Sequence, residues 1–257
     1  MWGDIEDYSV NDINEMTDTL AYAPNSNPTY EVDSVDSTVM RYNFNNENGK
    51  DYSGNGYDLS EQVNVSYDEG RTSDALTLKG NESYVETPVE NLGINSTIEF
   101  WVKRDANSTD EEQILFESDK GAIKAVQKET GKLGFSREWH DYSFNYELPK
   151  GEWVKIKLNT AMTVTKLYVN DELVDTLGIN ATGGKWASLV IPLNRIGSTE
   201  KAFQGQIDDV IVEKKVAECT ATATSEQSQD KAANAIDGNT SSMWHTKWDG
   251  SDELPQS

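Results

Sequence analysis

The stretch Ser96-Thr-Ile-Glu-Phe-Trp-Val-Lys103 decides the fold. Every second side chain in it is apolar, in the order Ile98, Phe100 and Val102. A period of two is that of a β-strand with one face towards a core. We therefore predict a strand at 96–103, and we expect the neighbouring segments to build their sheets around it.

Between Val39 and Val216 the same alternation recurs in short segments that turn-forming residues separate. The turns are Asp68-Glu-Gly70, Lys79-Gly-Asn81, Glu129-Thr-Gly-Lys132, Val169-Asn-Asp-Glu172 and Thr182-Gly-Gly184. Regular strand spacing with turn signals predicts an all-β, two-sheet antiparallel sandwich. The segments 133–139 and 142–146 alternate cleanly and predict a hairpin that turns at His140-Asp141.

The composition excludes several classes of partner. The chain has 257 residues and a net charge of −23, which argues against nucleic acid and anionic membranes because both reward positive charge. No apolar run approaches the roughly 18–20 residues of a membrane span. The single cysteine, Cys219, forbids an internal disulfide. A well-solvated surface on a secreted or cell-surface protein accounts for the acidity.

The first 30 residues do not resemble the start of a domain. Ile13, Met16 and Leu20 share one helical face, and Pro24 and Pro28 end the predicted short helix. One such helix cannot bury its apolar stripe alone. We expect residues 1–30 to be the remnant of an upstream domain with a linker, and the polar residues 31–38 to be a connector.

Seven blocks of the central region carry a family resemblance. They are Arg41-Tyr-Asn-Phe44 with Asp51-Tyr-Ser-Gly-Asn-Gly56, Ala75-Leu-Thr-Leu-Lys-Gly80, Tyr84-Val-Glu-Thr-Pro88, Ile98-Glu-Phe-Trp-Val102, Gly151-Glu-Trp153, Leu167-Tyr-Val-Asn-Asp171 and Gly205-Gln-Ile-Asp-Asp-Val210. In this order they resemble a laminin-G-like, concanavalin-A-like domain over residues 31–216. The resemblance implies a jelly roll with a concave and a convex face.

The two ends of the chain resemble other modules. Ala232-Ala-Asn-Ala-Ile-Asp-Gly-Asn-Thr240 and Met243-Trp-His-Thr-Lys-Trp248 are similar to the opening third of a discoidin-type domain, whose bacterial versions are family 32 carbohydrate-binding modules. Residues 217–257 are too short to complete that β module, and pieces this short rarely hold a core. The strand end Trp2-Gly-Asp4 with its helix resembles the last unit of a family 20 glycoside hydrolase barrel. The alternative for this segment is a helix beside a linker.

The sequence gives no catalytic residues for residues 31–257. Glycoside hydrolysis needs two carboxylates on one side of a cleft, roughly 5–9.5 Å apart. The central strand offers Glu99 alone, and the adjacent Asp208 and Asp209 point to opposite faces of a strand. The chain has two histidines, His140 and His245, and no cluster with transition-metal spacing.

A structural calcium ion is the expected cofactor. Calcium takes roughly six to eight oxygen ligands from carboxylates, amides and carbonyl groups. Asp51 and Asn55 in the turn-rich segment and Asp208 in the last strand supply such oxygens, and the laminin-G resemblance implies that the two regions are neighbours. The alternative is that Asp51 and Asn55 only cap their own turn.

Sugar binding requires an exposed aromatic ring beside polar groups. Trp139, His140 and Tyr142 lie at the predicted hairpin tip, and Trp186 follows a glycine-rich loop, so these four are the candidate sugar-binding residues. The alternative is that the two tryptophans cover a sheet edge. Trp101 and Trp153 fall inside the family blocks, and we expect them in the core.

These observations predict a non-catalytic accessory region of a secreted, multimodular glycoside hydrolase, with a β-N-acetylhexosaminidase as the candidate parent. The sandwich binds a host or mucin-type glycan or acts as a spacer, as a monomer within a larger chain. Two alternatives remain open. The sandwich is an adhesin or structural domain that binds protein, or it is a glycoside hydrolase in its own right.

Overall fold

The computed structural model describes residues 29–46, 48–137, 140–178, 187–222 and 231–235. The chain divides into two compact units, one formed by Ser37–Lys214 and the other by the two ends of the chain, Met1–Asp36 and Lys215–Ser257. The predicted helix at 13–20 lies outside the described residues, as does most of the segment that resembles a discoidin domain. From that segment the structure describes the end of a strand and a 3-10 helix, Ala232–Ala235.

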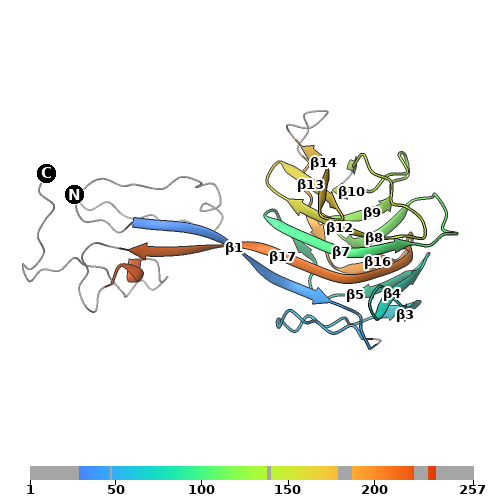
Figure 1. The fold of residues 1–257 in the computed structure, drawn as a ribbon, viewed down its shortest axis with the longest axis horizontal. Coiled ribbons are helices and arrows are strands. Elements are labelled where there is room, and N and C mark those ends of the chain that lie inside the picture. Colours follow the sequence, from blue (N-terminus) through green and yellow to red (C-terminus); the bar gives the residue numbers. More distant parts are fainter. Residues whose placement is uncertain (1–28, 47, 138–139, 179–186, 223–230, 236–257) are drawn as a thin grey trace, which may run out of the picture. The chain divides into compact units, whose positions relative to one another are not determined.

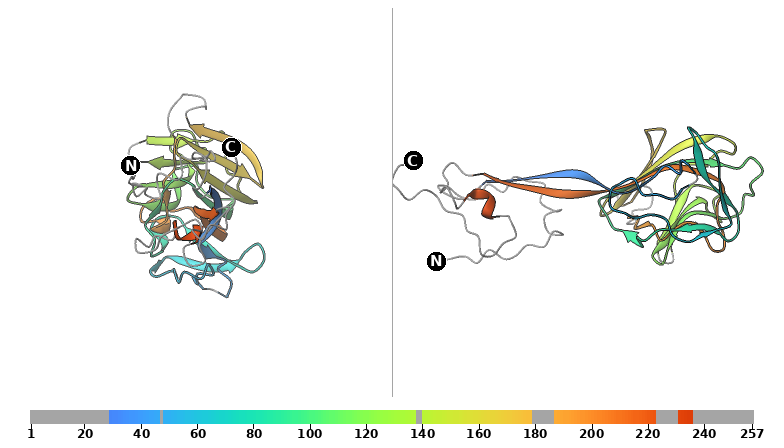
Figure 2. Two further views of the ribbon diagram at one scale, coloured as in Figure 1. Left: turned by 90° about the vertical axis from the view of Figure 1, so that its left-hand side faces the viewer. Right: turned by 90° about the horizontal axis from the view of Figure 1, so that it is seen from below.

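The first sheet, sheet A, has the predicted strand β7 at its centre. Its antiparallel order is β14 (Glu172–Gly178), β13 (Val164–Val169), β12 (Trp153–Thr160), β7 (Ser96–Arg104), β17 (Gln204–Thr222), β4 (Asp74–Lys79) and β3 (Val65–Glu69). The first strand, β1 (Thr29–Tyr42), pairs with β17, and the two run side by side in Figure 2. The polar segment 31–38 therefore belongs to a strand, which its composition does not predict. The boundary between the two units falls within this segment, between Asp36 and Ser37.

The second sheet, sheet B, packs its apolar face against that of the first. Its antiparallel order is β11 (His140–Ser143), β10 (Gly134–Arg137), β9 (Gly121–Val126), β8 (Gln113–Ser118), β16 (Arg195–Ser198), β5 (Ser83–Glu86) and β2 (Gln62–Val63). A small third sheet pairs β6 (Asn91–Leu92) with β15 (Ile191–Pro192). Sheets A and B form the two layers of the sandwich (Figure 1).

Apolar side chains from the two sheets meet in one core. Ile98, Phe100 and Val102 of β7 are fully buried, as their alternation predicts. The Phe100 ring contacts the ring of Phe116 on β8, with centroids 5.0 Å apart, and so joins the two sheets. The all-β, two-sheet antiparallel prediction is confirmed. In the described part of the chain no helix has the length and apolar character to cross a membrane.

Two local predictions are wrong. The hairpin at 134–143 forms, but Arg137 pairs with His140, so His140 and Asp141 belong to strand β11 and not to the turn. Trp101 and Trp153 are not core residues. They alternate with the buried residues of β7 and β12 and lie half-buried on the outward face of sheet A.

Candidate functional site

Two of the predicted sugar-binding residues lie together at one edge of the sandwich. His140 and Tyr142 of β11 line a hollow of about 200 Å³ with the end of β14 in the other sheet. Its described lining residues are His140, Asp141, Tyr142, Ser143, Leu177, Gly178 and Ala187. We call this the edge hollow. Trp139 and Trp186, the other two candidates, precede His140 and Ala187 in the sequence and lie outside the described residues.

The aromatic side of the edge hollow is fixed by packing. The Tyr142 ring stacks on the fully buried ring of Phe135, with centroids 5.0 Å apart and an interplanar angle of 20°. The exposed His140 ring is 6.4 Å from the Tyr142 ring. Because Tyr142 is half-buried and anchored while His140 is exposed, the pair offers one rigid ring and one accessible ring to a ligand.

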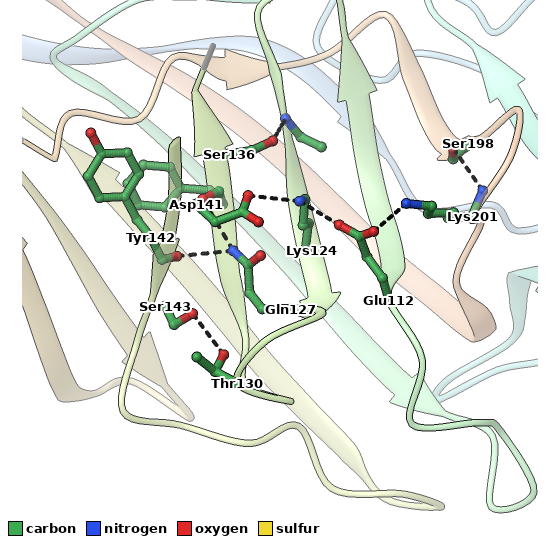
Figure 3. A network of polar contacts seen from close by, with 12 residues as sticks. Glu112, Lys124, Gln127, Thr130, Ser136, Asp141, Tyr142, Ser143, Ser198 and Lys201 are labelled. Atoms are coloured by element: carbon green, nitrogen blue, oxygen red, sulfur yellow. Dashed lines mark hydrogen bonds and ion pairs between the residues drawn. The ribbon is translucent and has the colours of Figure 1, made fainter. Parts of the chain in front are cut away.

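Charged and polar contacts hold β11 from the other side of sheet B (Figure 3). The Asp141 carboxylate is 2.8 Å from the ammonium of Lys124, which is 2.6 Å from Glu112, and Glu112 is 2.5 Å from Lys201. Burial opposes the ionised form of Glu112, but hydrogen bonds from the two lysines outweigh it and lower the pKa of that carboxyl. This chain of ion pairs fixes the backbone that carries His140 and Tyr142.

A second, larger hollow lies on the outward face of sheet A. It has a volume of about 570 Å³ and spans β3, β4, β17 and β7 with the loop that precedes β12. Its described lining residues are Asp68, Thr77, Leu78, Lys79, Lys103, Asp105, Ala106, Gly151, Gln204, Gly205 and Gln206. We call this the sheet A groove. No residue of this groove was among the predicted site residues.

Two tryptophans lie beside cations on the same face of sheet A. The guanidinium of Arg71 is 4.3 Å from the ring centre of Trp101, and the Lys103 ammonium is 6.0 Å from the ring centre of Trp153. Arg71 is also ion-paired with Asp209 at 3.5 Å. The sequence does contain the signal for this arrangement, because alternation with Phe100 and Val102 already assigns Trp101 to the outward face.

The predicted calcium ligands have other partners. The carboxylate of Asp51 accepts four hydrogen bonds, from the backbone of Arg41, Ser53 and Tyr57 and from the Ser53 hydroxyl. The side-chain amide of Asn55 donates to the carbonyl groups of Thr38 and Val39. These bonds are those of a capped turn, and they leave Asp51 no free lone pair for a metal.

Asp208, the third predicted ligand, is buried on β17. Its oxygens accept hydrogen bonds from the backbone N–H groups of Asp209 at 2.8 Å and Arg71 at 3.4 Å. Within the described ranges, no group of three or more histidine, cysteine, aspartate or glutamate side chains could hold a metal ion. As arranged here, Asp51, Asn55 and Asp208 do not fit a calcium site, and the calcium ion stays a prediction.

The carboxylates weighed for catalysis are also engaged. Glu99 is 3.1 Å from the Lys155 ammonium and 3.8 Å from that of Lys157. Asp209 pairs with Arg71, and Asp208 is only 1% exposed. Glu99, Asp208 and Asp209 are all absent from the described lining of the edge hollow and of the sheet A groove.

A two-sheet antiparallel sandwich of this kind is the architecture of concanavalin-A-like domains. Residues 79–218, more than half of the chain, match the family model described as the concanavalin A-like lectin/glucanases superfamily. The chain therefore belongs to this family. No curated protein matches it in sequence.

Solved structures show the same fold in two binding domains. Domain 4 of AbnA, a GH43 extracellular arabinanase from Geobacillus stearothermophilus in complex with arabinotriose, is 16% identical with a TM-score of 0.52, over 76% of this chain and 96% of that one. The ligand-binding domain of botulinum neurotoxin serotype D, in complex with N-acetylneuraminic acid, is 17% identical with a TM-score of 0.51, over 70% of this chain and 48% of that one. The chain thus spans about half of the toxin domain. At these identities the likeness establishes the fold alone.

Proposed function

We propose that this chain is a non-catalytic glycan-binding region of a secreted, multimodular glycoside hydrolase. The observation that carries the proposal is the edge hollow, which is lined by His140 and Tyr142, two of the four residues predicted as sugar contacts, together with the end of β14 from the other sheet. Family membership agrees with it, and so do the ligands in the titles of the two similar structures, arabinotriose and N-acetylneuraminic acid.

The chemistry of the edge hollow suits a sugar. A sugar ring has an apolar C–H face that packs on an aromatic ring and a rim of hydroxyl groups that donate and accept hydrogen bonds. The exposed His140 ring would take the apolar face, and the ring nitrogens of His140 and the Tyr142 hydroxyl would meet the rim. We include Trp139 and Trp186 in this proposed site because of their places in the sequence.

A glycan array followed by calorimetric titration of the best ligand tests the proposal. His140→Ala should weaken binding at least tenfold, because losing an aromatic contact and a hydrogen bond costs about 1.4 kcal/mol or more. Lys120→Ala, a change at a well-exposed lysine in the turn between β8 and β9, is the matched control and should bind like the wild type. An array that stays blank for neutral and acidic glycans alike would refute the proposal.

The wider assignment has its own tests. We propose that residues 1–30 belong to a family 20 hydrolase barrel, that residues 217–257 begin a discoidin-like module, and that the parent chain is secreted or on the cell surface. Determining the sequence on both sides of this chain tests all three. The upstream sequence should complete the barrel, the downstream sequence should complete the module, and a signal peptide should open the parent chain. Calorimetric titration of chelator-treated protein tests the calcium ion, and absence of both heat and a change in melting temperature would remove it.

A protein-binding role is the second candidate, and one edge of sheet A favours it. Leu173 and Val174 of the edge strand β14 are 54% and 42% exposed. An exposed apolar edge strand can pair with a strand of another chain. Replacing both residues by lysine should abolish binding to a matrix protein and leave glycan binding unchanged, whereas unchanged binding to the matrix protein would contradict this role.

A further inference from the structure

The outward face of sheet A carries a row of polar side chains that ends at a tryptophan. Gln206 of β17 pairs with Thr77 of β4 on one side and with Lys103 of β7 on the other. Lys103 in turn pairs with Trp153 of β12, so the four residues form a row across four neighbouring strands. Three steps between neighbouring strands span about 14 Å, since strands lie about 4.8 Å apart. The row crosses the sheet A groove and then continues to Trp153 at its border.

The charged groups of the sheet A groove are balanced in number. Two carboxylates, Asp68 and Asp105, and two ammonium groups, Lys79 and Lys103, line it. Among the described residues, none of these four side chains makes an ion pair. A strongly anionic or cationic ligand would leave two of the four charges opposed by a like charge, whereas a neutral ligand would not.

Hydrogen-bonding capacity in the groove also remains open. The Gln206 amide nitrogen donates to the carbonyl of Glu69 at 3.0 Å and lies 3.5 Å from the Thr77 hydroxyl, but its amide oxygen accepts nothing from a described residue. Lys79 and Lys103 add free donors, and one oxygen of Asp105 is a free acceptor, since the other accepts from Asn107. Alternating free donors and acceptors fit hydroxyl groups, which do both.

From these observations we propose that the sheet A groove binds a stretch of a neutral oligosaccharide chain, with Gln206 and Lys103 holding its hydroxyl groups and the Trp153 ring packing on a sugar face. This is a second site, separate from the edge hollow. The groove lies over β3, β4, β17 and β7, whereas the described lining of the edge hollow comes from β11, the end of β14 and Ala187. Its volume of about 570 Å³ falls within the roughly 300–1,000 Å³ of ligand clefts. Because the row is longer than one sugar ring, affinity should rise with chain length.

Affinity electrophoresis and calorimetry with neutral arabino-, xylo- and cello-oligosaccharides, from the monomer to the hexamer, test the proposal. We expect the affinity for one series to rise with length and to fall about tenfold in Gln206→Ala, which removes polar contacts only, and further in Lys103→Ala. Trp153→Phe keeps an aromatic ring if Trp153→Ala fails to fold. Lys166→Ala, on the same face but on β13 and outside the groove, is the matched control.

The outcomes separate this site from the proposed function. If neutral chains bind and His140→Ala alone weakens them, the groove is not a site, while glycan binding at the edge hollow stands. If acidic glycans bind at the edge hollow and no neutral chain binds at all, the groove proposal also fails. If Gln206→Ala weakens binding and His140→Ala does not, the groove proposal holds and the assignment of the edge hollow is wrong.

Discussion

Replacing Asp208 by asparagine should stabilise the protein at neutral pH. The carboxyl is buried on β17 and accepts hydrogen bonds from the backbone of Asp209 and Arg71. Burial, together with the negative charge of Asp209, raises the pKa of Asp208 from 3.8 to about 6, against the opposing effect of those hydrogen bonds and of the Arg71 charge. The folded protein therefore holds this proton more tightly than the unfolded chain does.

The sign and size of the effect follow from this pKa. Between pH 3.8 and about pH 6 the folded state keeps the proton and the unfolded state has lost it, so stability falls as the pH rises through this window. The difference in pKa corresponds to about 3 kcal/mol, since one pKa unit is worth about 1.4 kcal/mol. Asparagine does not titrate, but it loses one of the two hydrogen bonds, at a cost of about 1 kcal/mol. Asp208→Asn should therefore gain about 2 kcal/mol at pH 7 and lose about 1 kcal/mol at or below pH 4.

Urea unfolding of the wild type and of Asp208→Asn in EDTA at pH 4, 5, 6 and 7 measures the difference in their free energies of unfolding.

Asp68→Asn is the control, because its effect on stability at pH 7 should have the opposite sign. Hydrogen bonds from Thr77 and Ser66 lower the pKa of Asp68, so that variant should be less stable than the wild type at pH 7 and should lose this deficit as the medium becomes acidic. If the two proteins differ by the same free energy at all four pH values, or if Asp208→Asn is the less stable at pH 7, the reasoning about Asp208 is wrong.

Three further substitutions test the core, the turn and one backbone contact by denaturant unfolding. Phe100→Ala should lower the free energy of unfolding by about 4 kcal/mol, because it leaves a cavity where the Phe100 ring packs on Phe116 between the two sheets. A loss below about 1.5 kcal/mol would contradict that packing. Asp51→Ala should cost about 3 kcal/mol at pH 7 by leaving backbone N–H groups without an acceptor; since hydrogen bonding lowers its pKa, the deficit should shrink in acid, and a pH-independent deficit would speak against this cause. Gly197→Ala should cost about 2–3 kcal/mol, because its φ of +99° disfavours a side chain and a Cβ would collide with the Ser83 carbonyl oxygen; a neutral substitution would show that this backbone relaxes.

The inward face of the sandwich is the part of the fold that sequence reasoning predicts well. Burial selects residues by hydrophobicity, and a period of two assigns them to one face, so Ile98, Phe100 and Val102 are identified correctly. The segment 31–38 escapes this logic. It is mostly polar, with Val32 and Val35 as its apolar residues, and its strand is defined by pairing with β17, which lies far away in the sequence. Hydrogen bonds between distant strands leave no period in either segment.

The candidate sites were harder to predict, because the position of their residues depends on the register in which two strands pair. His140 and Asp141 resemble turn residues, whereas the register that pairs Arg137 with His140 puts them in a strand. Asp208 is a second case. The pairing of β17 with β7 shifts between Asp208 and Ile211, so two residues of β17 oppose Phe100 alone and Val210 returns to the core. Such a bulge comes from the fit between two strands, and the sequence of either strand by itself does not reveal it.

The net charge of −23 is a poor guide to the charge that a ligand would meet. Cations gather on the outward face of sheet A, where Lys103, Lys155 and Lys157 alternate with the buried residues of β7 and β12. Glu99 neutralises part of this charge by pairing with two of the lysines. Net charge governs solubility and long-range attraction, whereas selection of a ligand depends on the groups within a few ångströms of it. A neutral chain in the sheet A groove should therefore bind with an affinity that salt hardly changes, and a steep loss of affinity with added salt would show instead that the groove selects an anion.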